Sequence, residues 1–173
     1  MHAATTVTAS AARSNLYRLI DSSVMHHQPI VITGKRNNAV LVSERDWAAV
    51  QETLYLLSIP NMRESIIEGM NTPTQDFATS LDWWFVMSWT LHFSKSALKD
   101  SVKIKEAGLK SKAEILLSVL QKNPFQTPPP YEKLVGDLSG AYSRRINIQH
   151  RLVYQVAETE KAVRILRMWT HYE

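Results

Sequence analysis

The regular hydrophobic pattern of this 173-residue chain is interrupted once, by a polar stretch at residues 71–82. Neither the helical period of 3.6 residues nor the strand period of two runs through it, and Pro73 lies inside it. A stretch with so little apolar surface to bury should be disordered alone and should fold only on a partner. The sequence therefore predicts two folded units and a partner-dependent segment, with boundaries at residues 1–60, 84–173 and 61–83 respectively.

The charged residues are also distributed unequally between the two predicted parts of the chain. Residues 1–83 hold 6 Lys and Arg against 8 Asp and Glu, whereas residues 84–173 hold 14 against 8. The first part is thus mildly acidic and the second clearly basic. This asymmetry predicts that the second part meets a polyanionic partner, although a basic face that only keeps the protein soluble is the plain alternative.

Several classes of protein are excluded or disfavoured. The chain has no cysteine, which rules out disulfides and thiolate metal sites and makes the cytoplasm the default compartment. No apolar run reaches the roughly 18 residues of a membrane span, and the N-terminus lacks the regions of a signal peptide. His2, His26, His27 and His92 show no metal-ligand spacing, and no phosphate-binding glycine motif is present. We expect no metal, no cofactor and no membrane.

The first part predicts a small α+β domain. A strand at residues 5–8 precedes a helix that Thr8 or Ser10 can cap, and a hairpin of strands at 30–33 and 39–42 follows. A further helix starts at a capping-box pattern at residues 43–46, and a short one is expected at 61–70. The first helix has four apolar residues at helical spacing, which we expect to be buried: Leu16, Leu19, Ile20 and Val24.

The second part predicts two helices packed on a mostly antiparallel sheet. A strand at residues 89–93 is followed by helices at 95–106 and 111–123. Three further strands are expected at about residues 141–148, 151–158 and 162–171. The fold class is therefore α+β in both parts.

Strand alternation predicts which side chains share a face. We pair Asn147 with Arg151 across a three-residue loop, because this register places Ser143, Arg145 and Arg151 on one open face. A shift by one residue would bury an arginine. The apolar face should then carry five residues: Ile146, Ile148, Leu152, Tyr154 and Val156.

The last third of the chain holds the residue types that cleave RNA. Glu132 could take the proton of the 2′-OH, Arg145 and Arg151 could hold the phosphorane, and His171 could protonate the leaving oxygen beside Tyr172. Each residue alone has an ordinary explanation, since loop glutamates are mostly solvated and paired arginines mostly form surface ion pairs. Their joint order favours catalysis.

These residues stand in motifs that resemble the YoeB-type toxins, which are RelE-like ribosome-dependent endoribonucleases. The motifs, over about residues 87–172, are Asn-Pro-Phe at 123–125, Leu-Ser-Gly at 138–140, Ser-Arg-Arg-Ile at 143–146, His-Arg-Leu-Val-Tyr at 150–154 and the final His-Tyr. The resemblance implies Glu132 as general base, His171 as general acid, Arg145 and Arg151 on the scissile phosphate, and Tyr172 against a codon base. The product would be a 2′,3′-cyclic phosphate. Glu173, beyond the usual end, is a departure.

A second resemblance, to the Phd/YefM antitoxins, covers roughly residues 5–70. It rests on Ala-Arg-Ser-Asn-Leu at 12–16, Pro-Ile-Val-Ile-Thr at 29–33, Ala-Val-Leu-Val-Ser at 39–43 and Glu-Thr-Leu-Tyr-Leu-Leu at 52–57. The resemblance implies a homodimer that binds operator DNA, with Arg13 as a contact. The second contact would fall to Lys35 or Arg36, although Gly34 occupies the aligned position.

Together the two resemblances imply a fused antitoxin and toxin. We expect an mRNA endoribonuclease acting on the ribosome, held inactive by residues 61–83 of its own chain, and autorepression at operator DNA. One alternative is a DNA-binding autorepressor whose toxin half is silent and acts as co-repressor. Another is an inert remnant, which the presence of every candidate catalytic residue disfavours. Coverage of the toxin half by its own chain is expected, with a swap between protomers as the rival.

Overall fold

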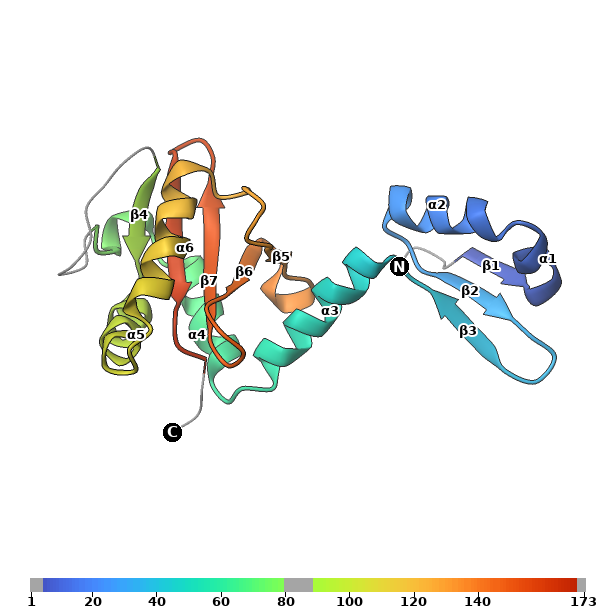
Figure 1. Cartoon of the computed structure of the whole chain (residues 1–173), viewed down its shortest axis with the longest axis horizontal. Coiled ribbons are helices and arrows are strands. Elements are labelled where there is room, and N and C mark those ends of the chain that lie inside the picture. Colours follow the sequence, from blue (N-terminus) through green and yellow to red (C-terminus); the bar gives the residue numbers. More distant parts are fainter. Residues whose placement is uncertain (1–4, 80–88, 171–173) are drawn as a thin grey trace. The chain divides into compact units, whose positions relative to one another are not determined.

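The computed structural model describes residues 5–79 and 89–170. The chain forms two compact units, Met1–Gln51 and Glu52–Glu173 (Figure 1). Both units combine helices with a sheet, so the predicted α+β class is confirmed. Within the described ranges, no helix is both long and apolar enough to cross a membrane.

The first unit is built on a three-stranded sheet. Strand β1 (Thr5–Thr8) pairs in parallel with β2 (Ile30–Thr33), which pairs antiparallel with β3 (Asn38–Leu41). Helices α1 (Ala9–Ser14) and α2 (Leu16–His26) lie between β1 and β2 in the chain. Helix α3 (Glu44–Leu57) follows β3 and continues past the last residue of this unit.

The single predicted helix after β1 is two helices. Thr8 caps α1 as expected, since its hydroxyl accepts a hydrogen bond from the Ala11 N–H at 3.3 Å. The helix breaks at Asn15, whose side-chain amide donates to the Ala11 carbonyl at 3.0 Å. Asparagine competes for backbone groups in this way, which explains the break.

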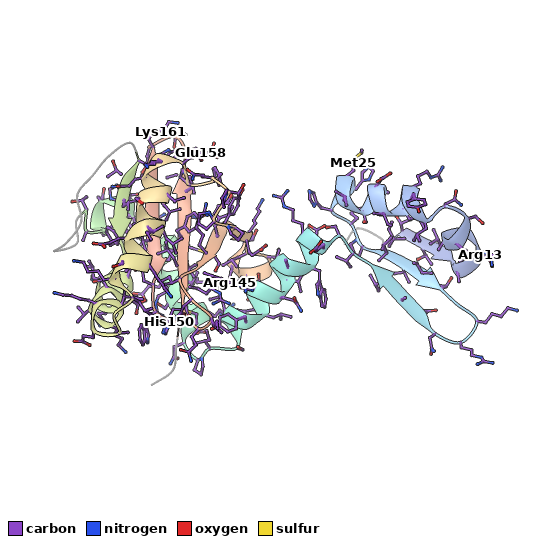
Figure 2. All side chains as sticks on the ribbon, in the orientation of Figure 1. Arg13, Met25, Arg145, His150, Glu158 and Lys161 are labelled. Carbon is purple, nitrogen blue, oxygen red and sulfur yellow. The ribbon has the colours of Figure 1, made fainter. Side chains whose placement is uncertain are left out.

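Helix α2 contradicts the prediction of a buried stripe. Leu16 is 45% exposed, Ile20 39% and Val24 54%, and Leu19 is only partly buried. The neighbouring Tyr17 and Met25 are exposed as well, and Met25 projects from α2 (Figure 2). The prediction was wrong for a single chain, because α1 and the small sheet do not cover this helix.

The second unit holds a five-stranded sheet of order β4-β8-β7-β6-β5, in which only β4 and β8 run parallel. This matches the predicted arrangement of two helices on a mostly antiparallel sheet. The strands are β4 (Thr90–Phe93), β5 (Glu132–Lys133), β6 (Ala141–Arg145), β7 (Arg151–Ala157) and β8 (Ala162–Arg167). The helices are α4 (Met62–Asn71), α5 (Lys95–Glu106) and α6 (Lys110–Lys122), with short 3₁₀ turns η1 (Thr74–Asp76) and η2 (Gly136–Leu138).

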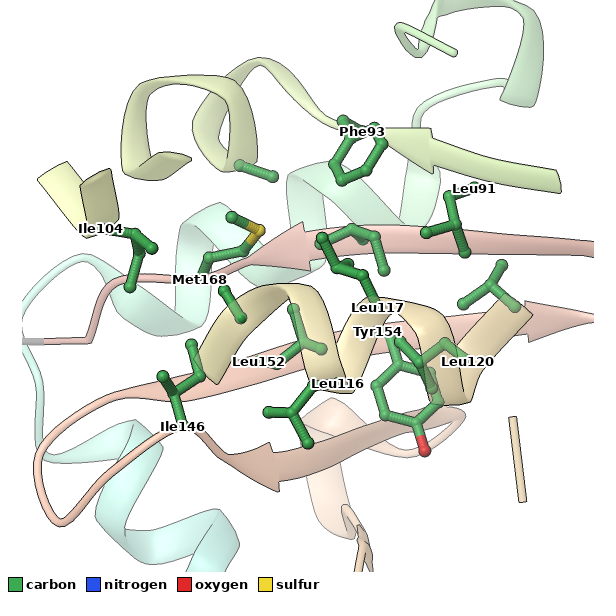
Figure 3. Close-up of a cluster of buried hydrophobic side chains, with 14 residues drawn as sticks. Leu91, Phe93, Ile104, Leu116, Leu117, Leu120, Ile146, Leu152, Tyr154 and Met168 are labelled. Carbon is green, nitrogen blue, oxygen red and sulfur yellow. The ribbon is translucent and has the colours of Figure 1, made fainter. Parts of the chain in front are cut away.

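One face of this sheet packs against α5 and α6. Leu116, Leu117 and Leu120 of α6 lie over Leu152 and Tyr154 of β7 (Figure 3). Helix α5 adds Ala97 and Ile104 to the same cluster. Of the residues predicted on the apolar face, Ile146, Leu152 and Tyr154 are buried, whereas Ile148 is 92% exposed in a turn.

The other face of the sheet packs against residues that precede the sheet in the chain. Leu56 of α3, Met62 and Ile66 of α4, and Phe77 form a second core with Val153 and Leu166. Gly69 allows α4 to approach β8 closely, because a Cβ built there would lie 3.0 Å from Leu166 Cδ2. The sheet is therefore covered on both faces, and one cover comes from residues 56–77.

The polar stretch after α4 also lies on this face. It contains the turn η1, and Ala78 exchanges backbone hydrogen bonds with Phe93 of β4, at 3.0 and 2.7 Å. Arg164 of β8 donates to the carbonyls of Gly69, at 2.9 Å, and Thr72, and its guanidinium lies over the Phe77 ring. The residues at 80–88, including the aromatic run at 83–85, lie outside the described residues.

The predicted register of the hairpin formed by β6 and β7 was wrong by two residues. Arg145, not Asn147, is the partner of Arg151, and Ser143 pairs with Val153. The loop is longer than predicted because the Asn147 side chain accepts hydrogen bonds from the N–H groups of Gln149, at 2.9 Å, and His150, at 2.6 Å. The grouping by face is confirmed, since a shift of two residues leaves each side chain on its own side. The prediction that this face is open was wrong, because Ser143 and Arg151 are buried on it.

Candidate active site and the segment that covers it

Two candidate arginines lie directly opposite each other. Arg145 ends β6 and Arg151 begins β7, and the two are Cα partners in the antiparallel ladder. Like charges in opposite positions repel, so such a pair is unfavourable unless an anion lies between them. Arg145 is exposed, whereas the Arg151 side chain is only 5% exposed. The two arginines thus face each other across the ladder, and one of them is covered.

The group that covers Arg151 is a carboxylate from the end of α3. Glu52 Oε1 accepts from Arg151 Nε at 2.7 Å and from Ser143 Oγ at 2.6 Å. The Glu52 side chain is also only 5% exposed. Arg151 Nη1 also donates to the carbonyls of Asn147, at 3.2 Å, and Ile148, at 3.1 Å. A buried ion pair with satisfied hydrogen bonds is costly to break from one side only.

Tyr55, one helical turn after Glu52, covers the same arginine from another side. The Arg151 guanidinium lies over its ring at 4.6 Å from the centroid. The Tyr55 hydroxyl donates to the Gln149 carbonyl at 2.6 Å. The Thr170 hydroxyl donates to the same carbonyl at 2.7 Å. Since Thr170 directly precedes His171, Tyr55 shares an anchor with the tail that carries the candidate acid.

Glu132 lies in the two-residue strand β5 at the sheet edge. Its Cα partner on β6 is Ser143, and side chains of directly opposite residues lie on the same face. The ladder thus places Glu132, Ser143, Arg145 and Arg151 on one face of neighbouring strands. Glu132 is partly exposed. His171 and Tyr172, together with Glu173, lie outside the described residues, so their roles stay predictions.

Next to this face, His150 and Trp169 stack with ring centroids 3.9 Å apart. His150 is buried in the turn that precedes Arg151, and Trp169 precedes Thr170. The stack holds Trp169 against the β6–β7 turn. Within residues 5–79 and 89–170, no group of three His, Asp or Glu side chains could hold a metal ion.

The candidate DNA contacts lie in the first unit, at one end of its sheet. Because β1 and β2 are parallel and Thr8 pairs with Thr33, α1 and the β2–β3 turn leave the sheet at the same end. Arg13 belongs to α1 (Figure 2), and Lys35 and Arg36 form the turn. All three are exposed. Gly34 opens the turn, where a Cβ would lie 2.5 Å from the Asn37 carbonyl oxygen. The turn therefore depends on glycine at this position.

Sequence reasoning missed Glu52, Tyr55 and Arg144. Glu52, Tyr55 and Leu56 share a helix face by their spacing, and this signal could have shown that a carboxylate lies within a buried surface. Arg144 lies between Ser143 and Arg145 on the strand, so alternation predicts that its side chain points to the opposite, apolar face. The sequence reasoning assigned no role to an arginine on that face.

Comparison with known proteins identifies a different family in each half of the chain. Residues 4–76 match the family described as antitoxin Phd_YefM of a type II toxin-antitoxin system, and residues 93–172 match the YoeB-like toxin of such a bacterial system. Antitoxin YefM of Streptomyces coelicolor is 38% identical over 76 residues, which are 44% of this chain and 87% of that protein. Toxin YoeB of Mycobacterium bovis is 35% identical over 85 residues, 48% of this chain and 98% of that protein.

Among solved structures, the YoeB-YefM complex from Staphylococcus aureus contains a chain that is 31% identical to this protein. The match covers 50% of this chain and 100% of that chain, with a TM-score of 0.44. The family matches at residues 4–76 and 93–172 define a type II toxin–antitoxin pair fused in one polypeptide. The chain belongs to the Phd/YefM antitoxin family through its first part and to the YoeB-like toxin family through its second. YoeB and RelE toxins are ribonucleases.

Proposed function

We propose that this chain is a latent endoribonuclease for mRNA on the ribosome, held inactive by its own residues 52–79. The observation that carries the proposal is the carboxylate of Glu52 on Arg151 and Ser143. Arg151 is one of the two arginines assigned to the scissile phosphate. A carboxylate is the side-chain group that best imitates a phosphate in charge and in hydrogen-bond acceptors. Substrate and inhibitor would therefore compete for one cation.

The proposed inhibitory segment extends further back than the boundary at residue 61. Glu52, Tyr55 and Leu56 all contact residues of the toxin part at 93–172 and belong to the last two turns of α3. Thr53 adds a backbone contact, because its hydroxyl accepts from the Val135 N–H at 3.0 Å. Beyond α3, Arg63 pairs with Asp137 at 2.7 Å. These contacts and the second core would hold the segment on the catalytic face.

In the uncovered state, the catalytic groups would act on a 2′-OH and the adjacent phosphate. Glu132 would accept the 2′-OH proton as general base, and His171 would protonate the leaving 5′-oxygen. Arg145 and Arg151 would hold the phosphate and stabilise the charge of the phosphorane, and a 2′,3′-cyclic phosphate would form. Tyr172 would stack on a base of the codon. The ribosome would supply the alignment for in-line attack.

The first unit is proposed to dimerise and to repress its own operator. Arg13, Lys35 and Arg36 stand at one end of its sheet, where they could contact phosphates and groove edges. Helix α2 leaves Tyr17, Val24 and Met25 exposed, and a second copy of this unit would bury them. A two-fold pair would then read a palindromic site. The cytoplasm is the compartment in which both proposed partners, mRNA and operator DNA, are found.

The test of latency uses the full chain. We define the opened chain as the protein carrying Glu52→Ala and Tyr55→Ala, which removes both groups on Arg151. In a purified translation system, the opened chain should cleave ribosome-bound mRNA and leave free RNA largely intact, and the wild-type chain should cleave neither. Adding Arg151→Ala or His171→Ala to the opened chain should lower the cleavage rate on the order of 10²-fold or more.

Glu64→Gln provides the matched control, because Glu64 is an exposed carboxylate on α4 and its loss leaves Arg151 covered. It should be as silent as the wild type. If the opened chain is folded but does not cleave ribosome-bound mRNA, the result would favour the second candidate function. That function is an autorepressor whose toxin half is catalytically inactive. Ribosome-dependent cleavage that survives Arg151→Ala and His171→Ala unchanged would refute the residue assignment.

A further inference from the structure

Arg144, between Ser143 and Arg145, points to the opposite face of β6 and is 1% exposed. It is the largest of the fully buried side chains. Among the described residues no carboxylate forms an ion pair with it. A buried charge without a counter-ion is expensive, so its environment must supply other compensation. The function assigned to its two neighbours does not explain this cost.

The compensation comes from one loop. Arg144 Nη2 donates to the carbonyls of Pro124, at 2.9 Å, and Gln126, at 2.8 Å, and Nη1 donates to that of Pro129. The guanidinium also lies over the Tyr131 ring, 5.1 Å from its centroid. Three carbonyls and a ring from residues 124–131 therefore surround a single cation.

Tyr154 strengthens the same arrangement. Its hydroxyl accepts from Arg144 Nε at 3.3 Å and donates to the Pro124 carbonyl at 2.9 Å. Burial raises the pKa of Tyr154 to about 12, so the hydroxyl keeps its proton. Lysine could not replace the arginine here, because one ammonium lacks the planar fork of five donors that reaches several carbonyls at once.

The loop held by Arg144 leads directly into Glu132. Strand β5 has two residues and one neighbouring strand, so few ladder hydrogen bonds fix its position at the edge of the sheet. Strand β6 presents Ser143 and Arg145 on the catalytic face, while Arg144 holds the loop from the other face. The loop then returns around the edge and places Glu132 opposite Ser143.

We infer that Arg144 is a positioning residue: it holds the loop at 124–131 so that Glu132 stands at a fixed place beside the phosphate-binding arginines. This inference rests on the proposed function, because it takes Glu132 as the general base. The gain from a correctly placed base is lost with small displacements, so the loop should matter to turnover more than to substrate binding.

The first measurement is amide hydrogen exchange of the full-length chain, which does not depend on catalysis. Arg144→Lys should speed exchange at residues 125–134 on the order of tenfold or more, while β7 and β8 keep their protection. Arg164→Lys is the matched control, since Arg164 likewise donates to several carbonyls, but in residues 69–72. It should loosen that segment and leave 125–134 unchanged. Should Arg144→Lys fail to fold, Tyr154→Phe is expected to loosen the same loop to a smaller degree.

The second measurement is a double-mutant cycle on cleavage by the opened chain. Arg144→Lys should lower kcat on the order of tenfold with little change in KM, and it should add almost nothing once Glu132→Gln is present. Unchanged exchange at 125–134 in both Arg144→Lys and Tyr154→Phe would overturn the inference. The inference would also be overturned if the losses in kcat caused by Arg144→Lys and Glu132→Gln were additive in the double mutant. If the opened chain with Arg144 intact does not cleave, the proposed function and with it the catalytic part of the inference fail, and exchange alone decides whether Arg144 holds the loop.

Discussion

At the scale of single residues, Arg144 and Arg151 are both buried on adjacent strands, but their charges are compensated by different kinds of partner. Arg144 is compensated by carbonyls and aromatic rings that belong to its own catalytic unit. Arg151 is compensated by a carboxylate that could leave with α3. The first arrangement is permanent as long as the sheet is folded. The second would be exchangeable for the phosphate of a substrate, as the proposed inhibition requires.

His92 is a partly buried residue whose protonation has a consequence that can be measured. It lies on β4 as the Cα partner of Arg164, the residue that holds the carbonyls of α4. Its Nδ1 is buried and has no hydrogen-bond partner among the described residues. Burial lowers the pKa of His92, with Arg164 adding to the effect and Glu160 opposing it. Protonation would therefore place a charge in a site that disfavours it.

The sign of the pH effect follows from this lowered pKa. The unfolded chain takes up the proton near the ordinary value of about 6.5, before the folded chain does. Stability from neutral His92 should be fully present above that pH and be lost as the pH falls toward the folded-state pKa. Denaturant unfolding of the wild type should thus show lower stability at pH 5.5 than at pH 7.5, and His92→Gln should flatten part of this difference. Parallel pH curves for the two proteins would contradict the prediction.

At the scale of elements, α4 is the part of the cover with the most apolar contact. Met62 and Ile66 are fully buried against the second core, and Gly69 lets the helix lie close to Leu166. The helix would have no such surface to bury if the sheet were absent. Its amphipathic pattern therefore has meaning only together with the strands that follow it in the chain.

Truncation of Ile66 tests this packing. Ile66→Ala should lower the free energy of unfolding of the second unit by about 2–5 kcal/mol, because it leaves a cavity between α4 and the sheet. Leu54→Ala is a suitable control, since Leu54 is 59% exposed on α3 and its loss should cost about 0.5 kcal/mol or less. Equal effects of the two substitutions in denaturant titrations would show that α4 does not depend on this contact.

The strands show what could be predicted from sequence and what could not. Most of the order of elements, the two resemblances and the shared face of Arg145 and Arg151 were predicted, because alternation and motif order are properties of the chain itself. The break between α1 and α2 and the short strand β5 were not predicted. The register was missed by two residues. Alternation repeats every two residues, so it cannot exclude that error; the Asn147 side chain decided the length of the turn.

The missed part of the candidate site depends on contacts between distant segments. Glu52 meets Arg151 across 99 residues, and Arg144 meets Pro124 across 20. No local pattern marks either pair, and helix spacing marks only that Glu52 shares a face with Tyr55. The exposed stripe on α2 was missed for the opposite reason: a correct helical pattern does not say whether the surface that buries it belongs to the same chain.

At the scale of the whole molecule, the exposed residues of α2 predict dimerisation. Val24→Glu should make the protein monomeric by sedimentation and weaken operator binding, since a charge would have to be buried in the interface. Gln28→Glu, an equal change of charge at an exposed position after α2, should leave the dimer intact. Arg13→Ala should keep the dimer but weaken DNA binding and reduce its salt dependence. A dimer that persists in Val24→Glu would place the interface elsewhere.

Inhibition within one chain should not depend on dilution. A tether keeps the inhibitory segment at a local concentration of roughly millimolar when geometry allows contact. The wild-type chain should therefore stay silent at the lowest concentration that an assay can reach. To test the swapped arrangement, the opened chain can be mixed with a chain that carries His171→Ala and an intact segment. Silencing of the opened chain at nanomolar levels would show that coverage runs between protomers.

The residues that cover the catalytic face come first in the chain, and this order has a consequence during synthesis. Residues 52–79 leave the ribosome before β4, and the sheet is complete only when β8 follows. At about 5–20 residues per second, the interval is roughly 5–20 s. Leu56, Met62 and Ile66 are therefore synthesised before Val153 and Leu166, the residues against which they pack. The proposed inhibitory segment is thus already present when the sheet of the toxin part forms, and that part is covered from the moment it folds.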